Sequence, residues 1–402
     1  MLDFGNFNTM VKRAAVYDPY LDTFGGGERY CLTVAEILLM AGWKVDLFWS
    51  GDPSLVKTAE SRFSLVLNGL NLVPDIFGLV PQNLDLIEDQ LSPDRLISHR
   101  PPQKSFIQKF LSLNYKYQIL RQYDVLFYLS DGSLPYLFSK KNLFHIQVPF
   151  AKNVKHNIFN TILKKRLIHR IICNSEFTAS FIEPGLKSKT TVLSPPVSVD
   201  SFTSSPQKQN QILSVGRFDN ILNLKRQDLL IDVFAKFVHQ NPQTDWKLIL
   251  AGSSQGDPSR NHYLLHLRQL ALNLPIEFSV NPDFLTLKDI YSKSSLYWHA
   301  AGFGVDESKS PQHVEHFGIS PVEAMASGVV PLLVKKGGLK EIITDGVDGY
   351  FWDTPPDLLA KTQLLINTKS DLQKLSLAVQ KSAKRFSKEI FSQKFLEIIN
   401  QP

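Results

Sequence analysis

The sequence has few cysteines and no long apolar run. The first argues against a disulfide-rich protein, and the second against a protein that spans the membrane. Only two cysteines, Cys31 and Cys173, occur among 402 residues. They lie far apart, each within an apolar stretch, so buried thiols in a reducing compartment explain them better than a disulfide framework or a cysteine metal site. No apolar run approaches the roughly 20 residues that a membrane-spanning helix needs.

The start of the chain also lacks the marks of a secretory signal. Residues 1–5 contain neither a basic nor an apolar region. We therefore expect a cytoplasmic protein. With 43% hydrophobic and 20% charged residues, the composition is that of a globular protein, and its length suits two domains with separate cores.

Acidic residues are absent between Asp131 and Glu176, within a chain of formal net charge +6. Apolar residues in the segment 152–170 recur at helical spacing, which predicts an amphipathic basic helix. We expect this helix to rest on an anionic membrane surface, at the inner face of the cytoplasmic membrane; a solvated helix face is the alternative. The cations of the interval are Lys140, Lys141, Lys152, Lys155, Lys164, Lys165, Arg166 and Arg170.

Two nucleotide-site motifs are also missing. The turn Gly25-Gly26-Gly27 does not fit the pattern Gly-x-Gly-x-x-Gly, and no acidic residue ends the next strand in the usual place, so a nicotinamide site is not expected. No Asp-x-Asp motif occurs. We therefore expect no metal site. We also expect no cofactor and no nucleic-acid partner.

The pattern that is present alternates strands and helices. Residues 13–17 and 44–49 read as strands around the glycine turn and a strongly apolar helix, which is the opening of a doubly wound sheet. Residues 123–130 and 142–149 read as further strands, and 63–67 and 96–98 as weaker ones. A second sheet is predicted from strands at 211–215, 246–250, 276–280, 296–299 and 329–334, and the tail 386–399 reads as a helix that crosses back to the first domain.

One stretch, from Glu315 to Glu323, places two carboxylates around a turn that enters a helix. Ser320 has the residue type of an N-cap, and Glu323 three residues later completes a capping box. A helix N-terminus offers unpaired N–H groups and a positive dipole end, so this turn predicts an anion site.

The same stretch, with Phe317-Gly318 after the first carboxylate, resembles the donor-site motif of retaining glycosyltransferases of the GT-B fold, family 4. Three further segments resemble that family: the turn Gly25–Arg29, the segment Gly216-Arg217-Phe218 followed by Lys225-Arg226-Gln227, and His145 near Pro149. The run from His145 to Pro149 is one residue longer than the family pattern, and the loop Val305–Val314 departs from its short form.

The resemblance implies an α/β fold of two doubly wound, Rossmann-like domains that face a cleft. The acceptor-side domain would comprise residues 1–198 and 387–402, and the donor-binding domain 199–386. Catalytic roles are implied for Arg217, Lys225, Glu315 and His145. Donor contacts are implied for Gly25, Gly26, Gly27, Gly216, His316, Phe317, Gly318, Ile319 and Glu323.

The activity implied is metal-independent transfer of a hexose, with retention, from a nucleoside diphosphate sugar to a lipid-linked or polysaccharide acceptor of the cell envelope. The motifs most resemble mannosyltransferases, so GDP-mannose is the expected donor. A UDP-glucose enzyme, a sugar-nucleotide epimerase of the same fold and a non-catalytic sugar-nucleotide-binding module stay open as alternatives. In the implied reaction Glu315 positions the sugar, and no enzymic nucleophile is assigned.

Overall fold

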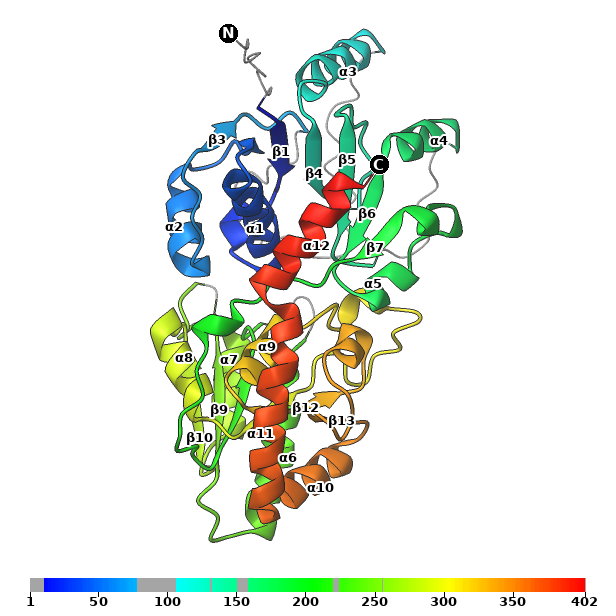
Figure 1. Ribbon diagram of the computed structural model, residues 1–402. Coiled ribbons are helices and arrows are strands. Elements are labelled where there is room, and N and C mark those ends of the chain that lie inside the picture. The colour runs from blue at the N-terminus through cyan, green and yellow to red at the C-terminus, as the bar shows by residue number, and fades with distance from the viewer. Residues whose placement is uncertain are drawn as a thin grey trace, which may run out of the picture.

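The computed structural model describes residues 11–77, 106–130, 132–149, 158–219, 224–254 and 256–401. Two α/β domains, each built on a parallel sheet, stand one above the other in Figure 1. Within the described ranges, no helix is long and apolar enough to cross a bilayer.

The first sheet has the strand order β3-β2-β1-β4-β5-β6-β7, and all its neighbours pair in parallel. Its central strand β4 is buried along its whole length, as expected when helices cover both faces of a parallel sheet. The strands are β1 (Arg13–Tyr17), β2 (Lys44–Phe48), β3 (Leu70–Val73), β4 (Val125–Leu129), β5 (Lys141–Ile146), β6 (Arg170–Cys173) and β7 (Thr190–Val192).

Two separate hydrophobic clusters, one on each face, flank this sheet. Tyr30 and Leu38 of α1 belong to the first cluster, together with Phe391 and Phe395 of α12. The helices of the first domain are α1 (Gly26–Met40), α2 (Ser54–Phe63), α3 (Phe106–Leu120), α4 (Ile158–Leu167), α5 (Glu176–Ser180) and the returning α12 (Lys388–Asn400).

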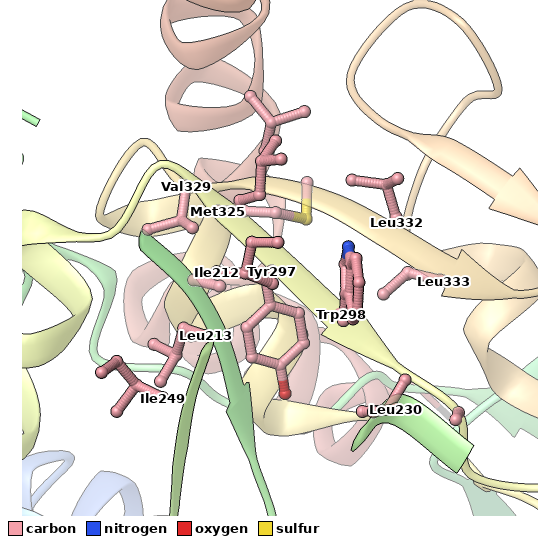
Figure 2. Close-up of a cluster of buried hydrophobic side chains, with 14 of the residues drawn as sticks. Ile212, Leu213, Leu230, Ile249, Tyr297, Trp298, Met325, Val329, Leu332 and Leu333 are labelled. Carbon is pink, nitrogen blue, oxygen red and sulfur yellow. The ribbon is translucent and has the colours of Figure 1, made fainter. Parts of the chain in front are cut away.

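The second sheet has the order β10-β9-β8-β11-β12-β13, again all parallel. Tyr297 and Trp298 of β11, both fully buried, lie at the centre of its core (Figure 2). The strands are β8 (Gln211–Val215), β9 (Lys247–Gly252), β10 (Ile276–Val280), β11 (Leu296–His299), β12 (Val330–Val334) and β13 (Tyr350–Trp352). The helices are α6 (Gln227–Gln240), α7 (His262–Leu270), α8 (Phe284–Lys293), α9 (Ile319–Ala326), α10 (Pro355–Asn367) and α11 (Lys369–Ala383).

The chain crosses between the domains at two places that lie together. Val197 and Ser387 form an isolated parallel bridge, and the Val197 N–H donates to the Phe386 carbonyl at 2.9 Å. Beyond this point α12 runs across the first domain (Figure 1), which confirms the predicted return of the tail. The two doubly wound sheets predicted from the sequence are therefore both present.

Some local predictions are wrong or lie outside the described residues. Residues 54–63 form helix α2, and the strand expected at 63–67 is instead β3 at 70–73, because Ser64 takes a left-handed conformation that ends the helix. The basic helix expected over 152–170 is α4, which ends at Leu167, and β6 begins at Arg170. The possible strand at 96–98 lies outside the described residues.

Candidate active site

The predicted site residues gather where the strand order of each sheet reverses. The reversal falls between β1 and β4 in the first sheet and between β8 and β11 in the second. Open α/β sheets bind ligands at the carboxyl ends of the strands beside such a reversal, because the loops there diverge and leave a crevice. The glycine turn follows β1, Gly216 and Arg217 follow β8, and His299 ends β11.

The glycine turn lies against the second domain and against β5. A Cβ atom on Gly26 would lie 3.1 Å from Ile319 Cδ1, and a Cβ on Gly27 would lie 2.9 Å from Gln147 Oε1. These close approaches explain why side chains are absent there. Since Gly26 begins α1 and Ile319 begins α9, the N-termini of two helices from different domains meet at this point.

Two acids beside the glycine turn have raised pKa values. Burial raises the pKa of Asp18, which follows β1, and also that of Glu28, in the first turn of α1. The Glu28 carboxyl accepts a hydrogen bond from the Gly25 N–H and so occupies that donor.

A three-membered polar cluster forms the centre of the second domain's contribution. Lys225 Nζ and His299 Nε2 contact the same oxygen of Glu315, at 2.5 and 3.1 Å. Burial opposes ionisation of Glu315, but the Lys225 charge and the His299 hydrogen bond outweigh it and hold the pKa of Glu315 well below its ordinary value. Burial lowers the pKa of His299, so the ring is a neutral hydrogen-bond donor to Glu315.

The two predicted cations differ in their surroundings. The stem of Lys225 passes over Gly216, where an added Cβ would lie 2.6 Å from Lys225 Cγ, so glycine is required there. Arg217 is half-exposed, with 51% of its side chain accessible, and its guanidinium lies 3.4 Å from Asp219. Lys225 is therefore held in a fixed ion pair, whereas Arg217 is accessible to a ligand.

Helix α9 begins earlier than the sequence suggested. Gly318, with φ 107°, is the residue before the helix, and Ile319 is its first residue. The predicted capping box is wrong: Ser320 is inside the helix and its hydroxyl donates to the Val215 carbonyl and accepts from Tyr297. A Cβ on Gly318 would lie 2.9 Å from Leu339 Cδ2, so both backbone conformation and packing demand glycine here.

Glu323 binds across the two domains. Its carboxylate lies 3.0 Å from Arg29 Nη1 of the first domain and 3.2 Å from the Tyr291 hydroxyl of the second. Arg29 also donates to Ser198 at the domain crossing. A second carboxylate, Glu341, accepts from the backbone N–H groups that begin α5, at 2.8 and 2.7 Å. The two domains are thus connected by two carboxylates of the second domain.

Three predicted site residues have buried side chains. His145 is fully buried, stacked on Tyr30 at 4.0 Å, and it hydrogen-bonds the Ile172 carbonyl, so it occupies the core of the first domain. Phe317 is buried against Phe386. His316 is 8% exposed, so its backbone rather than its ring faces the turn at Gly338.

Sequence reasoning missed several residues of this site, notably His299, Arg29 and Tyr291. His299 carried a signal, because it ends a strand beside the reversal of strand order, where ligand sites occur. Arg29 carried a signal as the last residue of the glycine-turn motif, but its pairing with Glu323 arises only where the domains pack. Tyr291 carried none, since its contact with Glu323 depends on tertiary packing.

Comparison with known proteins gives the family of the second domain and the fold of the chain. Residues 200–385, nearly the whole second domain, match the family model described as "Glycosyl transferases group 1". This domain belongs to that family. The glycosyltransferase of Rickettsia africae has the same fold, with a TM-score of 0.69 and 18% identity over 97% of this chain and 98% of its own. The HepE protein of Anabaena, solved with UDP and glucose, superposes with a TM-score of 0.65 and 16% identity over 96% and 99%.

The predicted GT-B fold is thereby confirmed. Among curated proteins, a Neurospora crassa protein named GDP-Man:Man(3)GlcNAc(2)-PP-Dol alpha-1,2-mannosyltransferase is 27% identical over 259 residues, covering 56% of this chain and 44% of the relative. The matched part is less than half the length of that relative.

Proposed function

We propose that this protein transfers a mannosyl group, with retention, from GDP-mannose to a lipid-linked glycan. The observation that carries the proposal is the convergence of two helix N-termini and the cations Lys225 and Arg217 at the carboxyl ends of both sheets. Such a site suits a diphosphate, because N–H groups and fixed cations stabilise its charge.

In the proposed reaction the bond between the sugar C1 and the diphosphate oxygen breaks, and C1 forms a bond to the acceptor oxygen on the same face. The acceptor's hydroxyl proton passes to the departing diphosphate. Negative charge therefore develops on the diphosphate in the transition state. Preorganised N–H groups of α1 and α9, together with Arg217 and Lys225, stabilise that charge without moving.

The two carboxylates have different proposed roles. Glu315 stays ionised beside Lys225 and positions the sugar, while His299 fixes the carboxylate. Glu323 holds the ribose hydroxyls, which requires that they take over contacts now made by Arg29 and Tyr291. Donor binding and the interdomain ion pair would then compete for one carboxylate.

The choice of mannose and of a lipid-linked acceptor is supported by the printed name of the Neurospora crassa relative, which specifies GDP-mannose and a dolichol-linked oligosaccharide. The cell envelope as the destination rests on the resemblance of the sequence motifs alone. If the protein hydrolyses the donor but transfers nothing to a lipid-linked glycan, a soluble polysaccharide is the indicated acceptor.

We further propose that the first domain contacts an anionic membrane, at the inner face of the cytoplasmic membrane, through α3 and α4. Ile162 and Leu163 on α4 are 46% and 40% exposed, beside Lys164, Lys165 and Arg166. Both helices lie on the same side of the first domain in Figure 1.

An aromatic group connects the two helices. Tyr117 of α3 packs on Phe138 at 5.4 Å, Phe138 stacks on Tyr136 at 6.1 Å, and the Lys164 ammonium lies 5.1 Å above the Tyr136 ring. Tyr115 adds a 60% exposed ring on α3. Aromatic and aliphatic side chains beside cations are the composition of an interfacial membrane contact.

A donor screen tests the proposed function. The purified protein is incubated separately with radiolabelled GDP-mannose, UDP-glucose and UDP-N-acetylglucosamine, with and without EDTA, and with a short lipid-linked glycan as acceptor. Transfer from GDP-mannose alone is expected, at a rate that EDTA does not change. Transfer only from a UDP-sugar would replace the donor. Hydrolysis of the donor without transfer would replace the acceptor, and an isomerised sugar or a donor left intact would refute glycosyl transfer.

A further inference from the structure

A glutamine carboxamide lies between the buried His145 and the glycine turn. Gln147 follows β5 at the carboxyl end of the first sheet, and its Nε2 lies 3.0 Å from His145 Nε2. Its Oε1 is the atom nearest to Gly27, 2.9 Å from the position of an added Cβ. The Gln147 carbonyl accepts a hydrogen bond from Asn174, which anchors the backbone.

The hydrogen bonds of His145 determine which end of the carboxamide faces the glycine turn. His145 Nδ1 lies 2.9 Å from the Ile172 carbonyl, which can only accept, so Nδ1 carries the proton. Complete burial lowers the pKa of His145 to about 3, so the ring is neutral and Nε2 is an acceptor. Nε2 therefore receives the N–H of Gln147, and the carboxamide oxygen is directed to Gly27.

This oxygen lies at the candidate active site. Gly27 is adjacent to Gly26, which meets Ile319 at the start of α9. The strands β1, β4 and β5 are neighbours in the sheet, so the turn after β1 and Gln147 after β5 share one edge. Gln147 is partly exposed, unlike His145, and among the described residues no hydrogen-bond donor engages its Oε1.

We propose that Gln147 Oε1 accepts a hydrogen bond from a hydroxyl of the transferred hexose, and that His145 is a positioning residue that orients the carboxamide for it. This inference rests on the proposed glycosyl transfer. It changes the role of His145: the imidazole acts through Gln147 rather than on the sugar. A carboxamide that rotated freely would present its NH₂ group and its oxygen to the sugar equally. The Gln147 carboxamide, fixed by His145, presents only its oxygen, which is an acceptor.

The test compares donors that lack one hydroxyl at a time. Wild-type protein is assayed with GDP-mannose and with its 2-, 3-, 4- and 6-deoxy analogues, and kcat/KM is compared. At one position wild type should lose about tenfold or more in kcat/KM, because the analogue cannot donate a hydrogen bond to Gln147 Oε1. Gln147→Ala should transfer that analogue and GDP-mannose at nearly equal rates.

His145→Phe tests the positioning role. Phenylalanine can stack on Tyr30 but offers no acceptor to Gln147, so discrimination at the same hydroxyl should fall several-fold although Gln147 is present. Gln393→Ala, on the exposed face of α12, is the matched control and should discriminate as wild type. The ratio of two donors on one protein is insensitive to a simple loss of stability.

Each of the following outcomes would overturn one part of the proposal. If Gln147→Ala still discriminates at every position, the sugar contact is wrong. If it loses only acceptor affinity, the oxygen faces the acceptor and the donor assignment is wrong. If His145→Phe discriminates as wild type, the positioning role is wrong. If the wild-type protein transfers hexose in these assays, the proposed function stands whatever the variants do. If it reacts with no nucleoside diphosphate hexose, the proposed function and the role of Gln147 are both refuted.

Discussion

Two neighbouring side chains, which contact the same oxygen of Glu315, stabilise its ionised form. Lys225 supplies a positive charge and the neutral His299 ring donates a hydrogen bond. Together they lower the pKa of Glu315 by more than burial raises it. Arg217 is half-exposed and lies beside Asp219 rather than Glu315. The two cations should therefore respond differently to substitution even though both are proposed to face the diphosphate.

Lys225→Ala and Arg217→Ala should each lower turnover by roughly 10²–10³, the scale for losing one preorganised group that stabilises a developing anion. Only Lys225→Ala should also destabilise the fold, by on the order of 2–5 kcal/mol, because Glu315 is left without its cation. Steady-state kinetics and thermal unfolding measure the two effects. Lys236→Ala, an exposed lysine of α6, is the control. Full activity of either variant would show that the cation does not contact the diphosphate.

His145 should make stability depend on pH. Its folded pKa of about 3 is below the unfolded value, so between pH 6.5 and about pH 3 the unfolded chain binds a proton that the folded chain does not. Its contribution is therefore lost as pH falls below 6.5, by about 1.4 kcal/mol per pH unit.

Urea unfolding of wild type and His145→Phe at pH 7, 6 and 5 measures this difference. The wild type should lose more stability than the variant over that interval, and the difference between them removes the opposing effects of Asp18 and Glu28, whose raised pKa values act in the other direction. Parallel curves for the two proteins would mean that His145 is not buried as a neutral ring.

At the scale of single elements, helix starts rather than helix bodies form the site. α1 begins at a glycine turn that Ile319 and Gln147 approach closely, and α9 begins after Gly318 in a left-handed conformation. Gly318 is required by its backbone conformation, whereas an added Cβ on Gly26 or Gly27 would meet the ends of the Ile319 and Gln147 side chains. α4 differs, because its exposed apolar and basic residues make it a surface element.

Replacing Lys164, Lys165 and Arg166 together by glutamine should weaken binding to anionic vesicles by about 10- to 100-fold. Each cation near such a surface contributes on the order of 1 kcal/mol, but Lys165 is paired with Glu183 and should contribute less. Co-sedimentation at low salt, with and without anionic lipid, measures it.

The matched control for α4 changes Lys369, Lys374 and Lys381, exposed residues of α11, to glutamine with the same change in net charge. This control should bind as wild type. If wild type ignores anionic vesicles at low salt, or if both triple variants bind equally weakly, α4 is not the membrane contact and a soluble acceptor is favoured.

At the scale of the whole molecule, the domains are held together by few polar contacts. Arg29 bridges to Glu323 and Ser198, and Glu341 holds the start of α5. The chain crossings at Val197 and Ser387 form a further connection. Because Glu323 is also the proposed ribose ligand, domain closure and nucleotide binding should be linked.

Arg29→Ala should raise the radius of gyration of the nucleotide-free protein in small-angle X-ray scattering, because one of the polar contacts that close the domains is removed. GDP should reduce the radius again if it connects the domains itself. Arg13→Ala, whose partner Asp46 lies within the first domain, is the control and should leave the radius unchanged. An unchanged radius in Arg29→Ala would show that the ion pair does not hold the domains closed.

The alternation of strands and helices could be predicted from local residues because hydrophobic period, glycine turns and proline linkers act over a few positions. The two sheets and the returning α12 followed from that pattern, as did the approximate location of Arg217, Lys225 and Glu315 at strand ends. The capping box at Ser320 failed because a tertiary hydrogen bond to Val215 and Tyr297 outweighs the local preference of serine for a cap.

What the folded chain alone decided are the contacts between residues distant in sequence. Neither the burial of His145 beneath Gln147 nor the pairing of Arg29 with Glu323, 294 positions away, leaves a local signal. The strand order places β5 beside β4, and the packing of the domains brings α1 to α9. The roles proposed for His145, Gln147 and Glu323 depend on these two arrangements. Local preferences act within a few residues, whereas these contacts depend on how two separately folded sheets pack against each other.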